Sequence, residues 1–314
     1  MSDCRSIQVL LVASGLLFLV GCAGLPGTFG GPLPTPTALI DPYNNVVATA
    51  EAAGDARARA AAYYERGNIQ LDLGDASAAI DDYTQAIALD PGNARAFHNR
   101  GLALVALGQG DQALADYSEA IRLDPLYVRA YRNRLVLLEQ RSDLAALAAD
   151  YAQLATIDPE NGAAYHYREG SARYGLRDRA GAQRAFDAAL RADPQHVDAL
   201  YERGLLNFAA GEHTAAIEDF DAALRLSPRA ANAYYARGLA YSASNDDASA
   251  INDFTRALEL QSNNPAALIG RASAAHALGR NDEAQADLKR LELLEVDSTL
   301  LVAIKLLRQQ LDGK

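Results

Sequence analysis

Arginine and aspartate recur together along this chain at a fixed separation. An arginine precedes a glycine in YYERG at 63–67, FHNRG at 97–101, LYERG at 200–204 and YYARG at 234–238. Together with Arg134 and Arg271, these make six arginines that are each followed by an aspartate 16 residues later. The pairs are Arg66 and Asp82, Arg100 and Asp116, Arg134 and Asp150, Arg203 and Asp219, Arg237 and Asp253, and Arg271 and Asp287. A guanidinium binds a carboxylate through two parallel hydrogen bonds. The arginines therefore either pair inside the protein or form a row of ligands for an acidic partner.

Other residue types that could carry chemistry do not form a site. The histidines are His98, His166, His196, His213 and His276, and they show neither metal-ligand spacing nor cysteine partners. GQGD at 108–111 lacks the lysine and the serine or threonine that a phosphate-binding loop needs. No nucleophile stands beside a base that could activate it. The sequence predicts no enzyme, no metal, no cofactor and no small-molecule substrate.

The composition narrows the class of partner. The chain has 314 residues, and 50% of them are hydrophobic, so it can bury a large core. Its formal net charge is −11 at pH 7, whereas nucleic-acid binding needs basic patches that complement phosphates. We therefore expect no nucleic-acid partner. The two cysteines are Cys4 and Cys22, which leaves none in the body of the chain for a disulfide or a metal cluster.

The N-terminus carries a short apolar run that ends close to Cys22. Residues 7–20, IQVLLVASGLLFLV, are too few to span a bilayer and are typical of a signal peptide. LVGC at 19–22 resembles the lipobox of bacterial lipoproteins. This resemblance implies a signal peptide over residues 1–21, cleavage before Cys22, and acylation of that cysteine with chains such as palmitate. The alternatives are an ordinary signal peptide and an uncleaved anchor with a chance cysteine.

The segment after the cysteine predicts how the body is held. Residues 22–45 are rich in glycine and proline, and we expect them to form a semi-extended tether. Several acyl chains give stable membrane attachment, whereas one chain binds only marginally. In Gram-negative lipoproteins an aspartate after the cysteine favours the inner membrane, and here that residue is Ala23. The resemblance implies a lipid-anchored envelope protein, in the outer membrane if the source is Gram-negative, with its body in the periplasm or outside the cell.

The rest of the chain repeats with a period of 34 residues. Pro91, Pro125 and Pro159 lie 34 residues apart, and Pro194 and Pro228 follow. Residues 60–93 place characteristic residues at Tyr63, Gly67, Gly74, Ala79, Tyr83, Ala86 and Pro91. Residues 94–127 supply Phe97, Gly101, Gly108, Ala113, Tyr117, Ala120 and Pro125 at the same places. This period and these residues resemble the tetratricopeptide repeat (TPR) family.

The TPR resemblance implies an all-α solenoid. In this right-handed superhelix each repeat is a helix, a tight turn and a second helix, here named helices A and B. We expect a lead-in helix at 46–59 and seven repeats over 60–296. We also expect a capping helix at 297–312, where apolar residues recur with helical spacing. Stacking buries apolar faces that one repeat cannot bury alone, so both ends of the array need caps.

Within this frame the arginines fall at position 7, on helix A, and the aspartates at position 23, on helix B. The two helices run antiparallel, which brings these positions opposite each other. The fourth repeat has neither residue and carries Glu169 and Ala185 there. We therefore predict ion pairs within the repeats. The alternative is that the arginines line the groove for an acidic ligand.

TPR ligands usually lie on the concave face formed by the A helices. Position 5 of helix A gives a mostly aromatic file of candidate contacts: Tyr64, His98, Arg132, Tyr167, Tyr201 and Tyr235. Tyrosine combines a large contact area with a polar tip, which suits a protein or peptide partner. The alternative is that these residues pack across neighbouring repeats. The carboxylate clamp of some TPR proteins is matched at Asn68, Asn99 and Arg129 but not at Tyr64 or Asn133, so we do not expect it.

Two repeats depart from the pattern. In the third, larger residues replace small ones and a serine replaces the turn glycine, at Leu135, Ser142, Leu147 and Leu154. The fourth carries one extra residue near Gly162. Since larger side chains keep helices apart, we expect wider helix spacing in the third repeat and a local bend in the solenoid.

The sequence as a whole favours a lipid-anchored TPR scaffold that binds protein or peptide partners at the cell envelope. One alternative is a pilotin-like lipoprotein that assists the assembly of pili, secretins or other outer-membrane complexes. The other is a soluble cytosolic scaffold, if the lipobox is a chance match.

Overall fold

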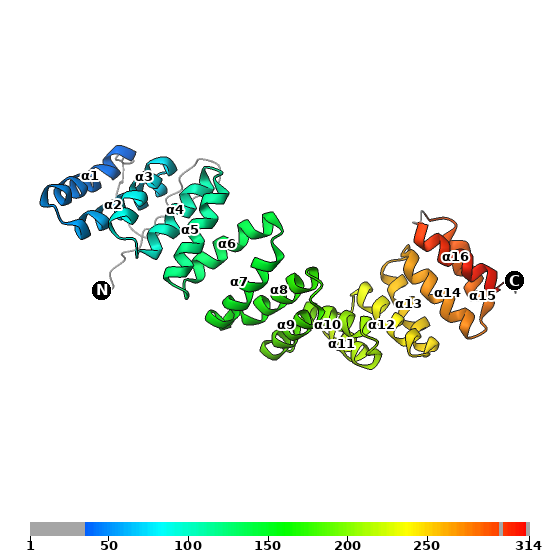
Figure 1. Ribbon diagram of the computed structural model, residues 1–314. Helices are drawn as coiled ribbons and strands as arrows, with labels where there is room; N and C mark the ends of the chain where they lie inside the picture. Colours follow the sequence, from blue (N-terminus) through cyan, green and yellow to red (C-terminus); the bar gives the residue numbers. More distant parts are fainter. Residues whose placement is uncertain (1–34, 295–297, 312–314) are drawn as a thin grey trace, which may run out of the picture.

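The computed structural model describes residues 35–294 and 298–311. The predicted signal peptide, Cys22 and most of the predicted tether lie outside these residues. The described chain contains sixteen α-helices and one short 3-10 helix, with no strand. Figure 1 shows them stacked in antiparallel pairs along an elongated superhelix, with α1 and α16 at its two ends.

The helices alternate between A and B along the chain. The A helices are α2 (Ala56–Asp72), α4 (Ala94–Ala106), α6 (Val128–Arg141), α8 (Gly162–Gly175), α10 (Val197–Ala209), α12 (Ala231–Ala243) and α14 (Pro265–Ala277). The B helices are α3 (Ala76–Leu89), α5 (Gly110–Leu123), α7 (Leu144–Ile157), α9 (Arg179–Ala192), α11 (His213–Leu226), α13 (Asp247–Leu260) and α15 (Asn281–Leu291). These seven pairs form the predicted all-α solenoid.

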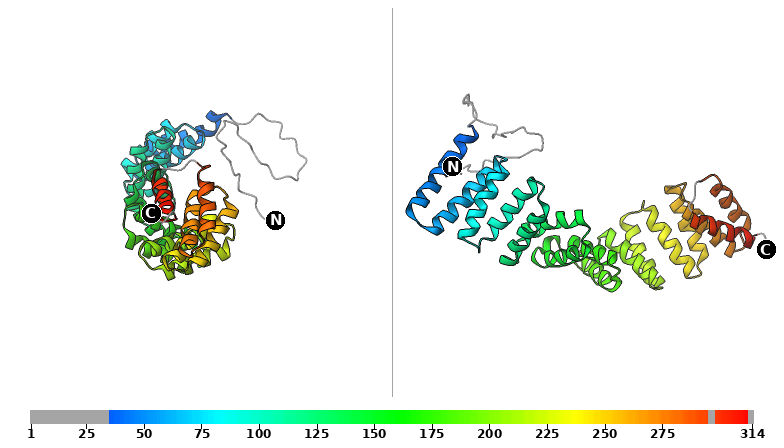
Figure 2. Two further views of the ribbon diagram at one scale, coloured as in Figure 1. Left: turned by 90° about the vertical axis from the view of Figure 1, so that its right-hand side faces the viewer. Right: turned by 45° about the horizontal axis from the view of Figure 1, so that its top comes forward.

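The A helices lie on the inner side of the superhelix. Each packs against the helix before it and the helix after it, and α2 also contacts α4, while α12 contacts both α10 and α14. A curved stack brings like helices together on its inner side. The view down the superhelix in Figure 2 shows the pairs winding around a central space. The A helices therefore form the concave face.

Local sequence signals set where the helices begin and turn. Asp75 caps α3, because its side chain accepts a hydrogen bond of 3.0 Å from the backbone N–H of Ala78. Between helices A and B one residue takes a positive φ, which glycine adopts without strain, as Gly74 does at 84°. Ser142 adopts the same left-handed conformation at 54° in the third repeat, so this turn survives the loss of its glycine.

The first helix begins earlier than the sequence predicted. α1 spans Pro36–Ala53 rather than residues 46–59, so residues 36–45 of the predicted tether are helical. Thr35 caps this helix, and Pro36 stands in its first turn, where the missing N–H has no helical partner to lose. Gly54, with a φ of 71°, ends α1, and Asp55 caps α2. The overall glycine and proline content of residues 22–45 hid this start signal.

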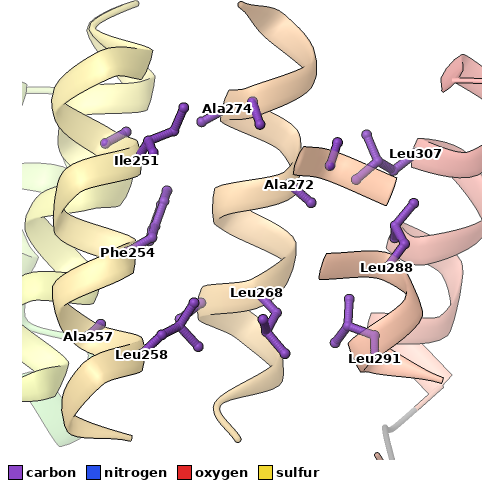
Figure 3. Close-up of a cluster of buried hydrophobic side chains, with 14 of the residues drawn as sticks. Ile251, Phe254, Ala257, Leu258, Leu268, Ala272, Ala274, Leu288, Leu291 and Leu307 are labelled. Carbon is purple, nitrogen blue, oxygen red and sulfur yellow. The ribbon is translucent and has the colours of Figure 1, made fainter. Parts of the chain in front are cut away.

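A helix closes the other end of the array. α16 (Ser298–Leu311) lies where the sequence places a capping helix at 297–312. It packs against α14 and buries Ile304 and Leu307. Figure 3 shows Leu307 close to Leu288 and Ala272, in the cluster that also contains Phe254. The last repeat thereby hides the apolar face that a further repeat would otherwise cover.

A glycine on helix A faces an aromatic ring on helix B in five repeats. Phe254 is fully buried, and a Cβ atom added at Gly238 would lie 2.8 Å from its ring. The same contact would be 2.5 to 2.9 Å for Gly67 on Tyr83, Gly101 on Tyr117, Gly170 on Phe186 and Gly204 on Phe220. Real Cβ contacts are longer than this, so the missing side chain is what allows the two helices to approach.

The third repeat accommodates a leucine at this place. Leu135 replaces the glycine opposite Tyr151, and both side chains are buried. The ring of Tyr151 lies 6.4 Å from that of Tyr165, on α8 of the next repeat. The extra residue of the fourth repeat is taken up by a 3-10 helix, η1 (Pro159–Asn161), just before α8. The wider spacing and the bend stay predictions.

Candidate partner-binding groove

Each arginine at position 7 binds the aspartate at position 23 of its own repeat. Arg237 donates from Nε to Oδ2 of Asp253 and from Nη2 to Oδ1, both at 2.7 Å. The same atoms pair at 2.5 to 3.0 Å in Arg66–Asp82, Arg100–Asp116, Arg134–Asp150, Arg203–Asp219 and Arg271–Asp287. All six aspartates are buried. These arginines therefore hold the repeats together and are not available to a ligand.

The remaining nitrogen of each guanidinium reaches the preceding helix pair. Arg203 Nη1 donates to Oδ1 of Asp187 at 2.9 Å, and Arg237 Nη1 donates to Oδ1 of Asp221 at 2.5 Å. Arg100 meets Thr84, Arg134 meets Ser118, Arg271 meets Thr255, and Arg66 meets Asn44 on α1. We call an arginine with its aspartate and this third partner an arginine staple. One staple joins three helices and links successive repeats.

The third partners were not predicted from the sequence, although their spacing offered a signal. Between repeats, each lies 16 residues before its arginine, at position 25 of the preceding repeat. Threonine, serine and aspartate share only the ability to accept a hydrogen bond, so no single residue type marks the position. Where α8 carries Glu169 instead of arginine, position 25 of the preceding repeat is Ala152. The staple is thus missing as a unit between α7 and α8.

The surroundings of the Arg237 staple keep its charges paired. The Arg237 guanidinium also lies 5.6 Å from the centre of the Tyr234 ring, a cation–π contact. The hydrogen bond to Asp253 raises the pKa of Arg237. Burial raises the pKa of the Asp253 carboxyl, although the guanidinium opposes that shift. A buried carboxylate of this kind depends on its arginine to stay charged.

The tyrosines predicted to line the groove are half-buried on the A helices. The rings of Tyr64, Tyr201 and Tyr235 lie 5.9 to 6.1 Å from the aromatic ring at position 24 of their own repeat. Tyr167 contacts Phe186 in the same way and also His196 of the following turn. One side of each ring therefore packs inside the protein, against its own repeat and, through the surrounding clusters, against the next repeat.

Two of these hydroxyls are unused. Within residues 35–294 and 298–311, the hydroxyls of Tyr201 and Tyr235 have no hydrogen-bond partner. Burial raises the pKa of both, so each hydroxyl keeps its proton and can donate it to an acceptor. The two tyrosines stand at the same position of α10 and α12, which contact each other. They therefore offer neighbouring donors on the concave face.

Comparison with known sequences decides the family. Models of the tetratricopeptide repeat match residues 94–127, 167–231 and 231–264, and a TPR repeat model matches residues 67–108. The chain belongs to the tetratricopeptide repeat family. Among curated proteins, no sequence matches it significantly. As many as 348 solved chains resemble this TPR protein in structure, so the fold alone selects no partner.

Two solved TPR structures illustrate the likeness. YrrB, described as a TPR protein with an unusual peptide-binding site, is 21% identical with a TM-score of 0.50, over 59% of this chain and 95% of that chain. The C-terminal part of a TPR repeat-containing protein from Cytophaga hutchinsonii is 16% identical with a TM-score of 0.55, over 76% of this chain and 98% of that chain. At these identities the likeness concerns the fold.

His98 does not face the TPR groove, contrary to the sequence prediction. It is buried, and its Nδ1 lies 3.0 Å from Oδ1 of Asn99 and 3.2 Å from the Tyr127 hydroxyl. Its Nε2 lies 2.9 Å from Nδ2 of Asn133 on α6. Burial lowers the pKa of His98, which favours the neutral ring. Both ring nitrogens are used to join α4 to α6, so this residue is not a ligand contact.

Arg132 is exposed but already occupied, which also corrects the prediction. Its Nη2 donates to Oδ2 of Asp158 at 2.7 Å, and its Nε donates to the Tyr165 hydroxyl at 3.0 Å. Unlike the tyrosines at this position, Arg132 is charged, and it pairs with a carboxylate of its own chain. These bonds link α6 to α8 across the junction that lacks a staple.

The asparagines that match the carboxylate clamp bond each other. Asn99 Nδ2 donates to Oδ1 of Asn68 at 2.8 Å and to the Tyr64 hydroxyl at 3.3 Å. The Tyr83 hydroxyl donates to the same Oδ1 at 2.9 Å. These bonds connect α2 to α4 and engage Tyr64. Of the predicted file, the tyrosines over repeats 4 to 6 remain for a partner.

The fourth repeat replaces its staple with bonds along one helix. Glu169 is buried on α8, and Oε1 accepts a bond of 2.7 Å from Nε of Arg173 one turn later. His166 lies 3.3 Å from Oε2. Since both partners lie on α8, they do not tie this repeat to its neighbours.

In the part of the chain that the structure describes, no group of histidine, cysteine, aspartate or glutamate side chains could hold a metal ion. No helix within that part is long and apolar enough to cross a bilayer.

Proposed function

We propose that this TPR protein is a scaffold that binds a protein or peptide partner in its concave groove, with Tyr201 and Tyr235 as contacts. The observation that carries the proposal is the pair of unused hydroxyls on neighbouring A helices. Leu205 and Leu239 follow one turn later on the same helices and are half-buried. Each helix thus presents a polar tip beside an aliphatic side chain, a combination that suits a peptide.

The test removes the hydroxyls and keeps the rings. Tyr201→Phe with Tyr235→Phe retains the packing against Phe220 and Phe254, so the fold should be unaffected. We expect affinity capture from membranes with the full-length protein to recover less of its partner. Tyr131→Phe with Tyr241→Phe is the matched control, because these rings pack beside staple arginines at 5.6 and 5.8 Å. Equal recovery with the groove variant and this control would count against the groove.

The proposal also places the protein at the cell envelope through acylation of Cys22. LVGC at 19–22 supports this. The early start of α1 shortens the link between Cys22 and the first helix. Residues 22–35 are the link that remains before Pro36, and a fully extended chain of that length reaches only about 50 Å. The solenoid would therefore work close to the membrane surface.

Acyl labelling in the host tests the anchor. We expect label on the wild-type protein and none on Cys22→Ser, together with a shift of that variant to the soluble fraction. Label that survives the substitution would contradict acylation at this cysteine. Wild-type protein recovered from the cytosol would instead favour the soluble scaffold. The pilotin-like role makes a separate prediction, namely that the captured partner is a pilus or secretin component.

A further inference from the structure

We propose that the groove has two ends of opposite charge, and that repeats 2 and 3 bind a partner segment that carries carboxylates beside apolar side chains. This proposal rests on the proposed function and adds the chemistry and the direction of the partner. It begins with two arginines, Arg95 and Arg129, which occupy the same position of α4 and α6. Both are exposed, and neither has an ion-pair partner within the described residues.

These two cations stand on neighbouring A helices that are joined through the His98 ring. Arg129 and Arg95 both act on the Tyr127 hydroxyl, where they oppose the burial that raises its pKa. Tyr127 in turn lies 3.2 Å from Nδ1 of His98, which joins α4 to α6. The Asn99 and Asn133 amides are bonded to the His98 ring, and within the described residues neither guanidinium is bonded to them. The result is a positive patch on the concave face of a chain with a net charge of −11.

Helix stability alone disfavours cations at these places. Arg95 and Arg129 stand in the first turns of α4 and α6, where the helix dipole favours acidic residues. Repeat 5 follows that preference, because Asp198 occupies the equivalent position in the first turn of α10. Departures from local preference are expected at functional sites. The exchange of arginine for aspartate also reverses the charge at this position between repeats 3 and 5.

Apolar side chains follow the arginines on the same helix face. Leu102 and Val136 come seven residues after Arg95 and Arg129, which is two turns or about 10 Å along each helix. Val136 is 53% exposed, and Val105 on α4 is 42% exposed. A ligand that pairs with the arginines can therefore place aliphatic or aromatic side chains on this strip. Such a ligand carries carboxylates on one side and apolar residues on the other.

The A helix of repeat 5 presents the opposite charge. Glu202 on α10 is half-buried, and burial and Asp198 both raise its pKa. A basic residue of the partner would relieve this pair of carboxylates. The partner therefore has one favoured direction, with its acidic part over repeats 2 and 3. The chain's own residues 23–40 contain no acidic residue, so they do not match this surface.

Selection from random peptides tests the chemistry without a known partner. The probe is a displayed pool of random dodecapeptides, offered to the full mature protein in detergent. We expect recovered peptides to be rich in aspartate or glutamate with apolar residues. Against Arg95→Gln with Arg129→Gln, the best of them should bind roughly tenfold more weakly and lose most of their salt dependence. The matched control is Arg184→Gln with Arg191→Gln, which removes two exposed arginines from the outer helix α9.

Each result has a distinct meaning. Enriched peptides that are neutral or basic, or unchanged affinity in the Arg95 and Arg129 variant, would overturn the charge proposal and leave the groove proposal standing. Enriched acidic peptides whose affinity falls equally in the Arg184 and Arg191 control would also overturn it, since the effect would be one of net charge. No enrichment over beads without protein would count against both proposals. Because first-turn cations do not stabilise a helix, Arg95→Gln with Arg129→Gln should leave the unfolding midpoint unchanged or raise it.

Discussion

Arg203 and Asp187 belong to successive repeats, and the 2.9 Å bond between Nη1 and Oδ1 ties α10 to α9. The same guanidinium binds Asp219 on α11 with its other two nitrogens. A planar group with fixed donor directions thus sets the relation of three helices at once. Apolar side chains packed between the helices supply most of the buried surface, while the staples fix how one repeat is placed on the next.

Removing half of a staple should cost more than removing both of its charges. In Arg100→Leu the buried carboxylate of Asp116 loses its guanidinium, and we expect the free energy of unfolding to fall by roughly 3–5 kcal/mol. Arg100→Leu with Asp116→Leu removes both charges and should be closer to wild type. Urea unfolding followed by circular dichroism measures the three proteins. A double variant no more stable than Arg100→Leu would contradict the buried pair.

The contact between Gly238 and Phe254 should be sensitive to one methyl group. Gly238→Ala places a Cβ atom 2.8 Å from the ring and should destabilise the protein by roughly 1–3 kcal/mol. Repeat 7 has Ala272 opposite Leu288 at the same two positions, both buried. In a Phe254→Leu background the glycine-to-alanine step should therefore cost far less. Thermal unfolding of the four proteins checks this, and equal costs in both backgrounds would show that the ring is not the obstacle.

The histidine that joins α4 to α6 should make stability depend on pH. Burial lowers the pKa of His98 below its ordinary 6.5, so the unfolded chain takes up a proton at a higher pH than the folded chain. The groups that face the ring are the side chains of Asn99, Asn133, Tyr117 and Tyr127, with Arg129 nearby, and none is a carboxylate. The stabilisation is fully present above pH 6.5 and is lost as the pH falls below it, by at most about 1.4 kcal/mol per unit.

Urea unfolding at several pH values between about 5 and 7 measures how the stability changes around the ordinary pKa of histidine. His98→Gln should flatten the decline, whereas His276→Gln, outside the network, should keep it. A decline that is equally steep in all three proteins would assign it to other groups.

The junction between α7 and α8 should gain rigidity from a staple. Ala152→Thr, Glu169→Arg and Ala185→Asp together supply the three groups that the other junctions have. We expect slower amide hydrogen exchange in α7 and α8 of this variant, because opening the junction must then break an ion pair as well as apolar contacts. Glu169→Arg alone is the control, since it adds a cation without its carboxylate. Exchange that is unchanged or faster in the triple variant would contradict the assigned role of the staple.

The repeat frame made much of the fold predictable. Arg237 and Asp253 keep fixed positions in an antiparallel helix pair, so their pairing follows from spacing. The third partner did not follow, because Thr84, Ser118 and Asp221 share no residue type. His98 and Arg132 were assigned to the groove by position alone. The His98 imidazole is buried among amide neighbours, and the Arg132 guanidinium binds a nearby carboxylate. Both outcomes depend on neighbours that lie about one repeat away. Pro36 opens a helix that the average composition of its segment concealed.

The position that receives each staple differs in the seventh repeat. Five of the first six repeats offer threonine, serine or aspartate there, and Ala152 precedes the repeat without an arginine. In the seventh repeat the residue is Lys289. Lys289 has no acceptor for the third bond of a staple, so the seventh repeat holds its covering helix differently: α16 buries Ile304 and Leu307 and joins Arg308 to Glu292.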